Sequence, residues 1–256
     1  MDNKTFFISD AHLSLRKDES EVKKRELLLD FLNEVKRLKA NLFIVGDLFD
    51  FWFEYRHYIP KHFFRIIRAL QEMIDEGCKV YILSGNHDYW LGSFIESELG
   101  ATVYKNPVDT VINDKKFHIN HGDGLLKNDY GYRILKKILR NRFIIWAFRL
   151  IHPDIGFEIA KKVSSTSRNA VHQDSEKLEK IRREIMEFGK SKFEQGFDYV
   201  VTGHYHYPTE YCQSDKVFLN LGDWMRYFSF GYFDGDSLSL CYWTKEHEKG
   251  SGTNNV

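Results

Sequence analysis

Leu42-Phe-Ile-Val-Gly-Asp47-Leu-Phe-Asp50 is the stretch that decides the fold of this chain. It opens with an apolar run too short for a helix, and a glycine then breaks the run, which together predict a buried strand. Asp47 directly follows this strand, and ligand sites of α/β sheets lie at the carboxyl ends of strands. Gly-Asp after a strand can equally be a turn that caps a helix. The role of Asp47 therefore depends on what the other strand ends supply.

The segments around this strand predict a β-α-β arrangement. Residues 5–9 form a short apolar run typical of a first strand. Residues 19–39 and 60–77 carry apolar side chains at helical spacing, with Val22 and Phe64 among them. Alternating strands and helices predict an α/β fold. Further strands are expected at residues 79–83, 101–104, 108–112, 116–120, 197–201, 209–213, 216–221, 227–233 and 237–243, and further helices at residues 91–99 and 176–194.

The composition is that of one globular domain, or of one domain with a sizeable insertion. Of the 256 residues, 43% are hydrophobic, and 37 Lys and Arg balance 37 Asp and Glu. This balance excludes a disordered chain and indicates no nucleic-acid partner. Cys78, Cys212 and Cys241 are odd in number and far apart, which predicts reduced, mostly buried thiols in a cytosolic protein. We expect neither a secretion signal nor a membrane span.

Five of the predicted strands end in residues that can bind a metal ion. A single histidine at a strand end is more often held by a backbone hydrogen bond, but five such ends favour a metal site. All of these residues donate oxygen or imidazole nitrogen, a set that suits Mn²⁺, Fe²⁺ or Zn²⁺. They are too many for one ion, so we expect two divalent ions. The residues are Asp10, His12, Asp47, Asn86, His87, His121, His204 and His206.

Asp10 and His12 illustrate how such residues could converge. If the backbone stays extended after the first strand, residues two apart point to the same side. The two side chains would then face one metal ion. We therefore expect an extended backbone over residues 10–12.

The window from residue 130 to residue 151 differs in composition from the rest of the chain. It contains six Lys or Arg residues, no Asp or Glu, and many large apolar residues at helical spacing. This pattern is typical of a helix that lies on a membrane surface or binds an amphiphile. A core helix whose basic side chains extend to solvent has the same composition, and we take it as the more common explanation.

The strand-end motifs resemble those of the calcineurin-like metallophosphoesterases. The motifs are Asp10-X-His12, Gly46-Asp47, Gly85-Asn86-His87-Asp88, His121-Gly122-Asp123 and Gly203-His204-X-His206. The resemblance implies a four-layer α-β-β-α sandwich with two metal ions bridged by Asp47. Asp10, His12, Asp47 and His206 would hold one ion, and Asp47, Asn86, His121 and His204 the other.

The same resemblance implies a reaction at this site. A hydroxide that bridges the two ions would attack the phosphorus. His87 resembles the residue that stabilises the transition state or protonates the leaving group, with Asp88 as its orienting partner. A surface histidine in a turn is the alternative for His87.

Finer similarity points to the bacterial UDP-2,3-diacylglucosamine diphosphatases of lipid A synthesis. It rests on Ser9-Asp-Ala-His-Leu13, Gly46-Asp-Leu-Phe-Asp-Phe-Trp52 and Gly131-Tyr132. The resemblance implies hydrolysis of the diphosphate to UMP and 2,3-diacylglucosamine 1-phosphate, with Mn²⁺ as the expected metal. A helical cap insertion covers the acyl chains in that family. Here the cap would be residues 125–167, the core residues 1–124 and 168–243, and the polar tail 244–256 disordered.

These expectations extend to the substrate and to its location. Tyr132, Arg133, Ser164 and Arg168 are the candidate substrate-binding residues, although the polar stretch 164–168 could equally be an exposed loop. The lipid-linked nucleotide sugar implies a cytoplasmic protein at the inner-membrane surface, with no obligate protein partner.

One departure from the lipid family leaves an alternative open. The best-known members carry arginine at the position of His87, so a related phosphatase or phosphodiesterase with another substrate is the second hypothesis. A catalytically silent binding module is the third, and it predicts missing metal ligands. None of the motif residues is missing here.

Overall fold

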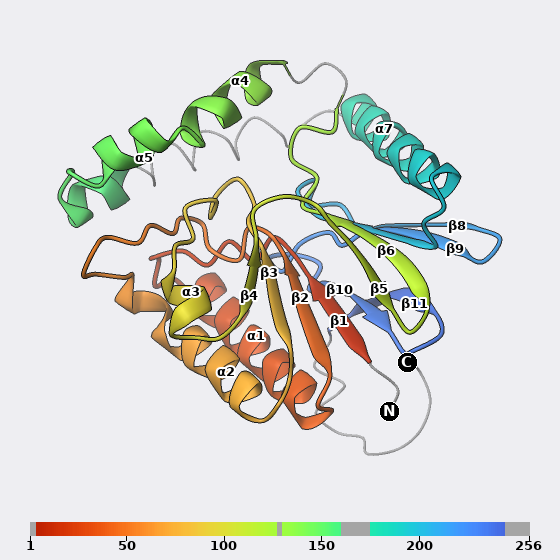
Figure 1. Cartoon of the computed structure of the whole chain (residues 1–256), viewed down its shortest axis with the longest axis horizontal. Helices are drawn as coiled ribbons and strands as arrows, with labels where there is room; N and C mark the ends of the chain where they lie inside the picture. The colour runs from red at the N-terminus through yellow and green to blue at the C-terminus, as the bar shows by residue number, and fades with distance from the viewer. Residues whose placement is uncertain (1–3, 127–129, 160–174, 244–256) are drawn as a thin grey trace.

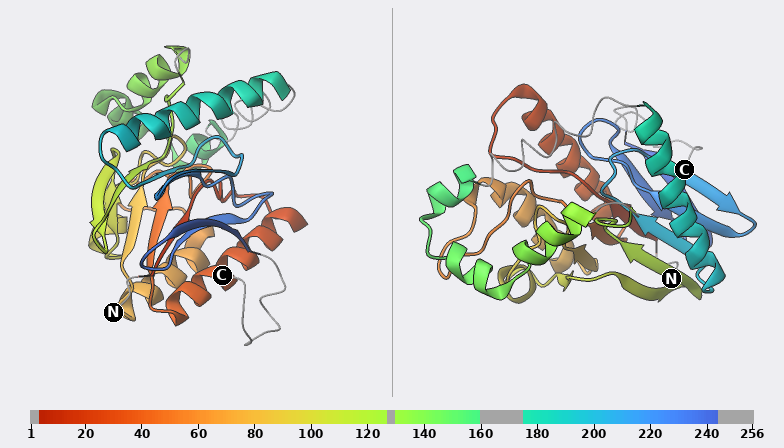
Figure 2. Two further views of the ribbon diagram at one scale, coloured as in Figure 1. Left: turned by 90° about the vertical axis from the view of Figure 1, so that its right-hand side faces the viewer. Right: turned by 90° about the horizontal axis from the view of Figure 1, so that it is seen from above.

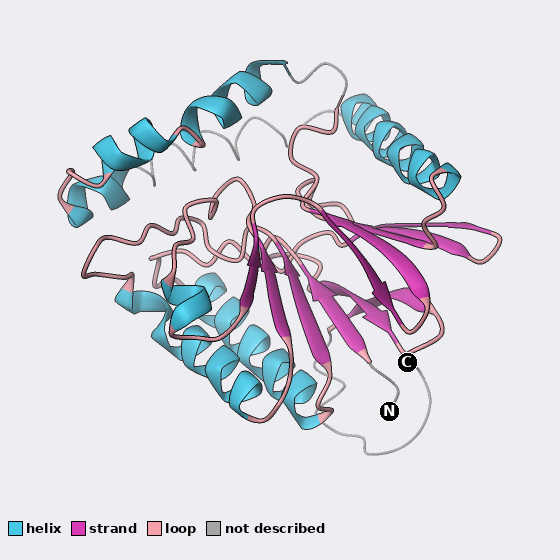
Figure 3. Ribbon diagram, in the orientation of Figure 1, coloured by secondary structure: helices cyan, strands magenta, loops and turns pink. Residues whose placement is uncertain are grey.

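The computed structural model of the chain describes residues 4–126, 130–159 and 175–243. Two β-sheets lie face to face, with helices on their outer sides (Figures 1 and 3). The first sheet has the order β11-β10-β1-β2-β3-β4 and the second the order β5-β6-β7-β9-β8. The first is built from β1 (Thr5–Ile8), β2 (Asn41–Val45), β3 (Val80–Leu83), β4 (Thr102–Tyr104), β10 (Ser229–Phe233) and β11 (Leu238–Tyr242), and the second from β5 (Val108–Ile112), β6 (Lys115–Asn120), β7 (Tyr199–Thr202), β8 (Thr209–Gln213) and β9 (Lys216–Asn220).

Helices cover both outer faces of this pair of sheets. α1 (Glu19–Arg37) and α2 (Phe64–Asp75) lie on the first sheet, and α7 (Ser175–Glu194) lies on the second (Figure 2). α1 begins after Asp18, whose side chain accepts a hydrogen bond from the backbone N–H of Glu21 at 3.0 Å, as an N-cap residue does. The short elements on the side of α2 are η1 (Lys61–Phe63) and α3 (Phe94–Ser97).

Apolar clusters join these four layers. The cluster between the first sheet and its helices contains Phe31 and Trp224. Between the two sheets, Phe7 and Phe117 stack with their ring centroids 5.7 Å apart. Phe218 belongs to the cluster that joins α7 to the second sheet. The central strands β1, β2, β7 and β10 are buried on both faces, which explains their mostly apolar sequences. The expected α-β-β-α sandwich is confirmed.

Strand register brings the chain segments that carry the candidate site together. β1, β2 and β3 run parallel, with the pairs Ile8–Ile44 and Val45–Leu83 near their ends. In the second sheet, β6, β7 and β9 run parallel and their last residues pair with one another. The segments that leave these strands therefore emerge side by side, as ligand sites of α/β sheets require.

The window from residue 130 to residue 151 is two helices rather than one. α4 (Tyr130–Leu139) and α5 (Arg142–Phe148) form what we call the helical arm, and residues 153–159 are also helical. Asn141 separates the two helices, and its side chain accepts a hydrogen bond from the backbone N–H of Phe143 at 2.8 Å. Neither helix contains a buried residue. The core-helix explanation is therefore wrong.

The cysteines are less buried than expected, and two apolar residues at helical spacing are exposed. Val22 is 50% exposed on α1, and Phe64 is 65% exposed at the start of α2, although both fit the helical spacing. The three cysteines are free thiols, but Cys212 is exposed and Cys241 only half-buried. Periodicity indicates which side chains share a helix face, and it does not show how far a neighbouring layer covers that face.

Some expectations concern residues outside the described ranges. Ser164 and Arg168 lie there, as does the tail 244–256. Among the described helices, none combines the length and the apolar character that a membrane span needs.

Candidate metal centre

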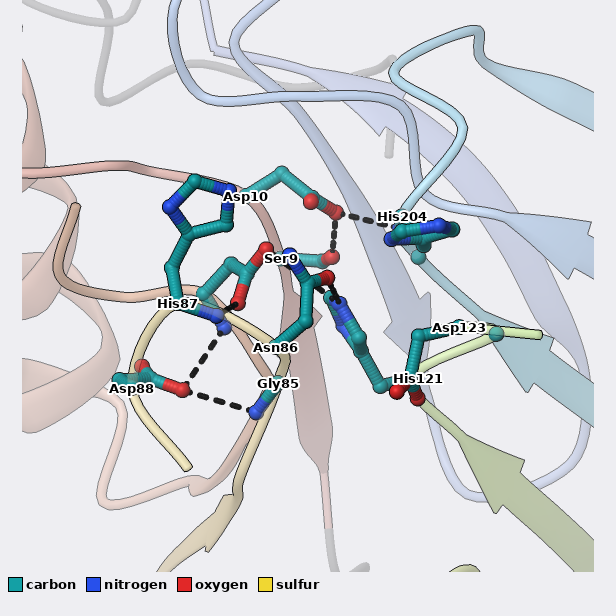
Figure 4. Close-up of polar contacts among 12 residues, drawn as sticks. Ser9, Asp10, Gly85, Asn86, His87, Asp88, His121, Asp123 and His204 are labelled. Atoms are coloured by element: carbon teal, nitrogen blue, oxygen red, sulfur yellow. Dashed lines mark hydrogen bonds and ion pairs between the residues drawn. The ribbon is translucent and has the colours of Figure 1, made fainter. Parts of the chain in front are cut away.

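Asp47 lies at the middle of a buried group of polar side chains at the carboxyl ends of the strands. Its Oδ2 atom is 3.6 Å from Nε2 of His12 and 3.4 Å from Nε2 of His121. Nε2 of His12 is also 3.5 Å from Oδ1 of Asp10. On the other side, Oδ1 of Asn86 is 3.2 Å from Nε2 of His121 (Figure 4). Side chains from both sheets thus meet at Asp47.

His204 and His206 complete two sets of possible metal ligands. In each set, one ligand atom per residue lies within 4.8 Å of the others. Asp47 belongs to the set that contains His121 and His204, and it also forms a group with His12 and His87. Asp47 is therefore placed between the two sets, where a bridging carboxylate would be. The sets are Asp10, His12 and His206, and Asp47, His121 and His204.

The backbone around these residues is left-handed rather than extended. Backbone hydrogen bonds hold this shape, from Asp10 N–H to the Gly46 carbonyl at 3.1 Å and from His12 N–H to the Asp47 carbonyl at 2.9 Å. The expected extended backbone is wrong, and the side chains converge through these turns instead. A left-handed residue other than glycine costs roughly 1–2 kcal/mol, which the surrounding sheets must offset. The left-handed ligands are Asp10 (φ 53°), His12 (φ 42°), Asp47 (φ 52°), His204 (φ 73°) and His206 (φ 54°).

Two glycines are required because the ligands approach the backbone closely. A Cβ atom at Gly46, which has φ 86°, would collide with the ring of His121. A Cβ atom at Gly85 would collide with the carboxylate of Asp47. Glycine before Asp47 and before Asn86 is thus a condition for packing the centre, which the sequence motifs alone do not show.

His121 is held in the orientation that a metal ligand needs. Its Nδ1–H donates to the backbone carbonyl of Val45 at 2.8 Å. This bond leaves Nε2 directed at Asp47 and Asn86. A metal-binding histidine usually donates a hydrogen bond from its other ring nitrogen to a carbonyl or carboxylate oxygen, which fixes the orientation of the ring.

Unpaired polar atoms show that this donor set fits divalent cations. Oδ1 of Asp10, both ring nitrogens of His12 and Nδ1 of His206 are buried and form no hydrogen bond. Buried polar atoms without partners are rare because their desolvation is costly. Coordination by a cation would satisfy Oδ1 of Asp10 and Nε2 of His12, and oxygen with imidazole nitrogen is a donor set for Mn²⁺, Fe²⁺ or Zn²⁺.

The shifted pKa values show that the buried carboxylates of this site favour positive charge beside them. Burial works to lower the pKa of His121, but the nearby Asp47 carboxylate outweighs it and raises the pKa to about 10. Burial works to raise the pKa of Asp10, but His206 and His12 lower it to about 2. Burial and His121 lower the pKa of His204 to about 4. Without metal, protons supply the balancing charge, so metal binding displaces protons.

His87 and Asp88 do not form the expected pair. Nδ1 of His87 contacts the backbone carbonyl of Asp50 at 3.0 Å, so Asp50 orients this ring. The Asp88 carboxylate instead accepts a hydrogen bond from the backbone N–H of Gly85 at 2.8 Å (Figure 4). It accepts another from the backbone N–H of Leu48, also at 2.8 Å. Asp88 therefore fixes the two loops that carry the ligands. It acts as a positioning residue for the centre.

With this geometry described, comparison with known proteins identifies the family. The sequence profile of the calcineurin-like phosphoesterases matches residues 4–208. The chain belongs to this family. Its relatives include a UDP-2,3-diacylglucosamine hydrolase of Porphyromonas gingivalis, 31% identical, with 94% of this chain and 97% of the relative covered. One of the same name from Proteus mirabilis is 33% identical, with 80% and 82% covered.

A solved structure of an archaeal phosphodiesterase also aligns with the chain, with a TM-score of 0.45 and 12% identity, covering 93% of this chain and 99% of that one. Calcineurin-like phosphoesterases use divalent metal ions, and the ligand sets described above lie within the matched residues. The chain is a metal-dependent phosphoester hydrolase.

Two acidic residues of this phosphoesterase centre escaped the sequence prediction. Oδ1 of Asp50 is 3.7 Å from Nδ1 of His12, and Oδ2 of Asp223 is 3.6 Å from Nδ1 of His206. Each carboxylate lies near the Nδ1 atom of a candidate ligand, as the carboxylate partners of metal-binding histidines do. For Asp223 a signal existed, because Gly222-Asp223 repeats after β9 the Gly-Asp pattern that follows β2. Asp50 follows the same strand as Asp47, three residues further along the chain.

The predicted substrate-binding residues that are described take different places in the phosphoesterase. The Tyr132 hydroxyl donates to Oδ2 of Asp123 at 3.0 Å, and its ring centroid is 5.8 Å from that of His204. Arg133 donates to the backbone carbonyl of Leu126 at 2.7 Å. Tyr132 therefore borders the metal centre, whereas Arg133 fixes the start of the helical arm.

An aromatic cluster joins the helical arm to the loops of the metal centre. Phe51 follows Asp50, and its ring centroid is 5.9 Å from that of Phe148 on α5. Trp90 lies 4.8 Å from Phe148 by ring centroids, and its Nε1–H donates to the backbone carbonyl of Leu139 at 2.8 Å. The loop after Asp47 thus supplies both the metal site and the attachment of the arm.

Proposed function

We propose that this phosphoesterase hydrolyses the diphosphate of UDP-2,3-diacylglucosamine, which yields UMP and 2,3-diacylglucosamine 1-phosphate. The observation that carries the proposal is the set of exposed apolar side chains on the helical arm. The backbone of the arm runs over the loops at the ends of the strands (Figures 1 and 2). The names of the relatives support the proposal. The exposed apolar residues of the arm are Tyr130, Ile134, Leu135, Ile138, Phe143, Ile144 and Trp146.

Acyl chains would cover this surface and explain why the arm exposes it. Ile138 is 49% exposed, Trp146 54% and Phe143 68%. Burying one such side chain against an acyl chain contributes about 1.5–3 kcal/mol. We assign residues 125–167 to a cap over the substrate, between the core segments 1–124 and 168–243.

The residues of the centre have distinct roles in this proposal. Asp10, His12, Asp47 and His206 would hold one metal ion, and Asp47, Asn86, His121 and His204 would hold the other. Two bound divalent ions supply an activated water and neutralise the charge on the phosphoryl group. We assign Mn²⁺ because carboxylate, amide and imidazole donors suit it.

His87 and Tyr132 act on the substrate from opposite sides of the centre. The backbone carbonyl of Asp50 holds the His87 ring 4.6 Å from the ring of His12 by centroids, where it can stabilise the leaving oxygen. Tyr132 donates to Asp123, its ring borders His204, and we assign it a contact with the sugar. Arg133, Ser164 and Arg168 stay proposed substrate contacts.

The basic side chains of the arm support a peripheral membrane location. Lys137, Arg142 and Arg149 are exposed among the apolar residues. Apolar and basic residues together bind the surface of anionic membranes. We therefore place the protein at the cytoplasmic face of the inner membrane, without a nucleic-acid or an obligate protein partner.

A pair of matched substrates tests the proposal. UDP-N-acetylglucosamine contains the same diphosphate as UDP-2,3-diacylglucosamine and lacks the long acyl chains. With Mn²⁺ present, release of UMP from the diacyl substrate should exceed release from UDP-N-acetylglucosamine by at least about a hundredfold, because two buried chains contribute several kcal/mol. Equal rates would refute the lipid assignment. Hydrolysis of bis(p-nitrophenyl) phosphate alone would favour a related phosphoesterase with another substrate.

A further inference from the structure

A cavity of about 90 Å³ lies beside the metal centre, under α4. Its walls come from α4 and from the segments that follow β3, β4 and β6. One buried water needs only about 10–15 Å³, so the cavity has room for a polyatomic group. His121 borders both this cavity and the metal centre, which makes the two spaces neighbours. The residues used below are Ser84, Lys105, Asn120, Asp123, Lys136 and Arg140.

The cavity carries an excess of positive charge. Lys105, Lys136 and Arg140 line it, against the single carboxylate of Asp123, which leaves two positive charges in excess. Nζ of Lys136 is 2.6 Å from Oδ2 of Asp123, and the Arg140 guanidinium is 3.3 Å from the same atom. Tyr132 donates to this oxygen as well. One oxygen of Asp123 therefore has three donors around it, and the excess positive charge favours an anion.

Lys105, which directly follows β4, supplies the third positive charge of the cavity lining. Its side chain is exposed, and no carboxylate lies within 4.0 Å of its ammonium group among the described residues. The ammonium group is 5.8 Å from the centroid of the Tyr89 ring, and the Arg140 guanidinium lies 4.1 Å from the same centroid. The Tyr89 ring thus lies near two of the cations that line the cavity.

Polar groups at the base of the cavity add hydrogen-bonding capacity. Ser84 is only 5% exposed, and its buried Oγ atom forms no hydrogen bond. Asn120, at the end of β6, lines the cavity beside it. Buried hydroxyl groups normally have partners, so a ligand that reaches Ser84 would satisfy a group left unpaired by the fold.

We propose that this cavity binds the second phosphoryl group of a diphosphate substrate while the first reacts at the metal centre. The assignment rests on the proposed function in requiring a diphosphate. Arg and Lys with hydroxyl donors are the groups that recognise phosphate in proteins. Because His121 borders both spaces, two linked phosphoryl groups of one diphosphate would each lie against this residue. The site favours substrates with two linked phosphoryl groups over simple monoesters.

Direct binding of two inhibitors to the Mn²⁺-loaded protein tests this assignment. Orthophosphate has one phosphoryl group and needs only the metal centre. Methylenediphosphonate has two and is not hydrolysed. Calorimetry at constant free Mn²⁺ should show that Lys105→Gln weakens methylenediphosphonate binding about tenfold, the size of one charge-assisted hydrogen bond, and leaves orthophosphate binding unchanged. Lys116→Gln, at an exposed lysine at the start of β6, is the matched control and should change neither.

Two results would overturn the proposal. The first is equal affinity of wild type and Lys105→Gln for methylenediphosphonate, or an equal loss for both inhibitors. The second is a second orthophosphate that binds to wild type and is lost in Lys105→Gln, because the cavity would then be a separate site for free anions. The experiment uses neither a nucleotide nor a lipid, so its outcome is independent of whether UDP-2,3-diacylglucosamine is the substrate.

Discussion

The metal centre and the helical arm differ in how deeply their functional side chains are buried. Asp10, Asp47 and His121 are 0%, 1% and 3% exposed, and both sheets and their loops hold them. The arm has no buried residue and exposes Ile138 and Trp146 to solvent. The chemistry thus depends on residues that the fold holds rigidly. The choice of substrate, in our account, depends on residues that only the substrate or a membrane would cover.

Energetics explain why the two regions differ. The left-handed ligands each cost roughly 1–2 kcal/mol, which only a large packed core can offset. Exposed apolar residues cost the fold little, since much of any protein surface is apolar. A substitution in the metal centre should therefore abolish turnover of every substrate. A substitution in the arm should lower turnover of the lipid-linked substrates alone.

The largest expected effect follows from removing the carboxylate shared by the two ligand sets. Asp47→Ala should reduce hydrolysis of all substrates by at least about a thousandfold, since metal-assisted activation of water would be lost. Metal content, measured by mass spectrometry of the purified protein, should fall as well. Asp75→Ala, an exposed carboxylate at the end of α2, is the control and should retain metal and activity. A fully active Asp47→Ala would disprove the dinuclear centre.

A buried ion pair beneath the centre should give the next largest effect. Glu21 is 1% exposed, lies 2.9 Å from Nζ of Lys24, and accepts from Ser14 N–H at 3.0 Å, while Lys24 donates to the backbone carbonyl of His12 at 2.7 Å. Glu21→Gln leaves a buried ammonium without its counter-charge, so stability should fall by about 3 kcal/mol. Urea unfolding measures this. Glu19 is exposed in the same helix, and the unfolding free energy of Glu19→Gln should lie within about 0.5 kcal/mol of the wild-type value. An equal loss of stability in both variants would contradict a special role for the buried pair.

The junction between the two regions should give a smaller and selective effect. Trp90→Phe keeps an aromatic ring but removes the hydrogen bond to the Leu139 carbonyl. One neutral hydrogen bond contributes about 1 kcal/mol, so turnover of the lipid substrate should fall about fivefold. Tyr242→Phe, 48% exposed at the end of β11, also keeps an aromatic ring and loses a polar hydrogen, so it is the control and should keep its activity. If both variants behave alike, the bond does not hold the arm in place.

The smallest expected effect concerns the membrane. Lys137 is exposed on α4, and one lysine near an anionic surface contributes about 1 kcal/mol. Lys137→Gln should reduce binding to phosphatidylglycerol vesicles about twofold to fivefold in a sedimentation assay at low salt. Lys79→Gln, an exposed lysine just before β3, should bind like wild type. Equal binding by both variants and wild type would argue against contact between α4 and the membrane.

The sequence predicts the fold and the meeting point of the ligands well. Short apolar runs that end in Gly-Asp or Gly-His are strands buried on both faces, and parallel strands bring their ends together. This is why Asp10, Asp47, Asn86, His121 and His204 can be grouped from the sequence alone.

Other features depend on contacts between distant segments and were not predictable. The left-handed turn at His12 is set by a hydrogen bond to the backbone of Asp47, from another strand. The role of Asp88 follows from backbone groups of Leu48 and Gly85 that approach it only in the fold. The exposure of the arm could not be read from periodicity, which is the same for a covered and an uncovered helix.

The ratio of kcat/KM for UDP-2,3-diacylglucosamine to that for bis(p-nitrophenyl) phosphate tests this division of roles most directly. The double variant Ile138→Ser and Trp146→Ser removes two exposed apolar side chains of the arm, and Val111→Ser, 61% exposed on β5, is the control. We expect the ratio to fall at least about tenfold in the double variant, because each buried side chain contributes about 1.5–3 kcal/mol, and to stay constant in Val111→Ser. An unchanged ratio in the double variant would contradict the account.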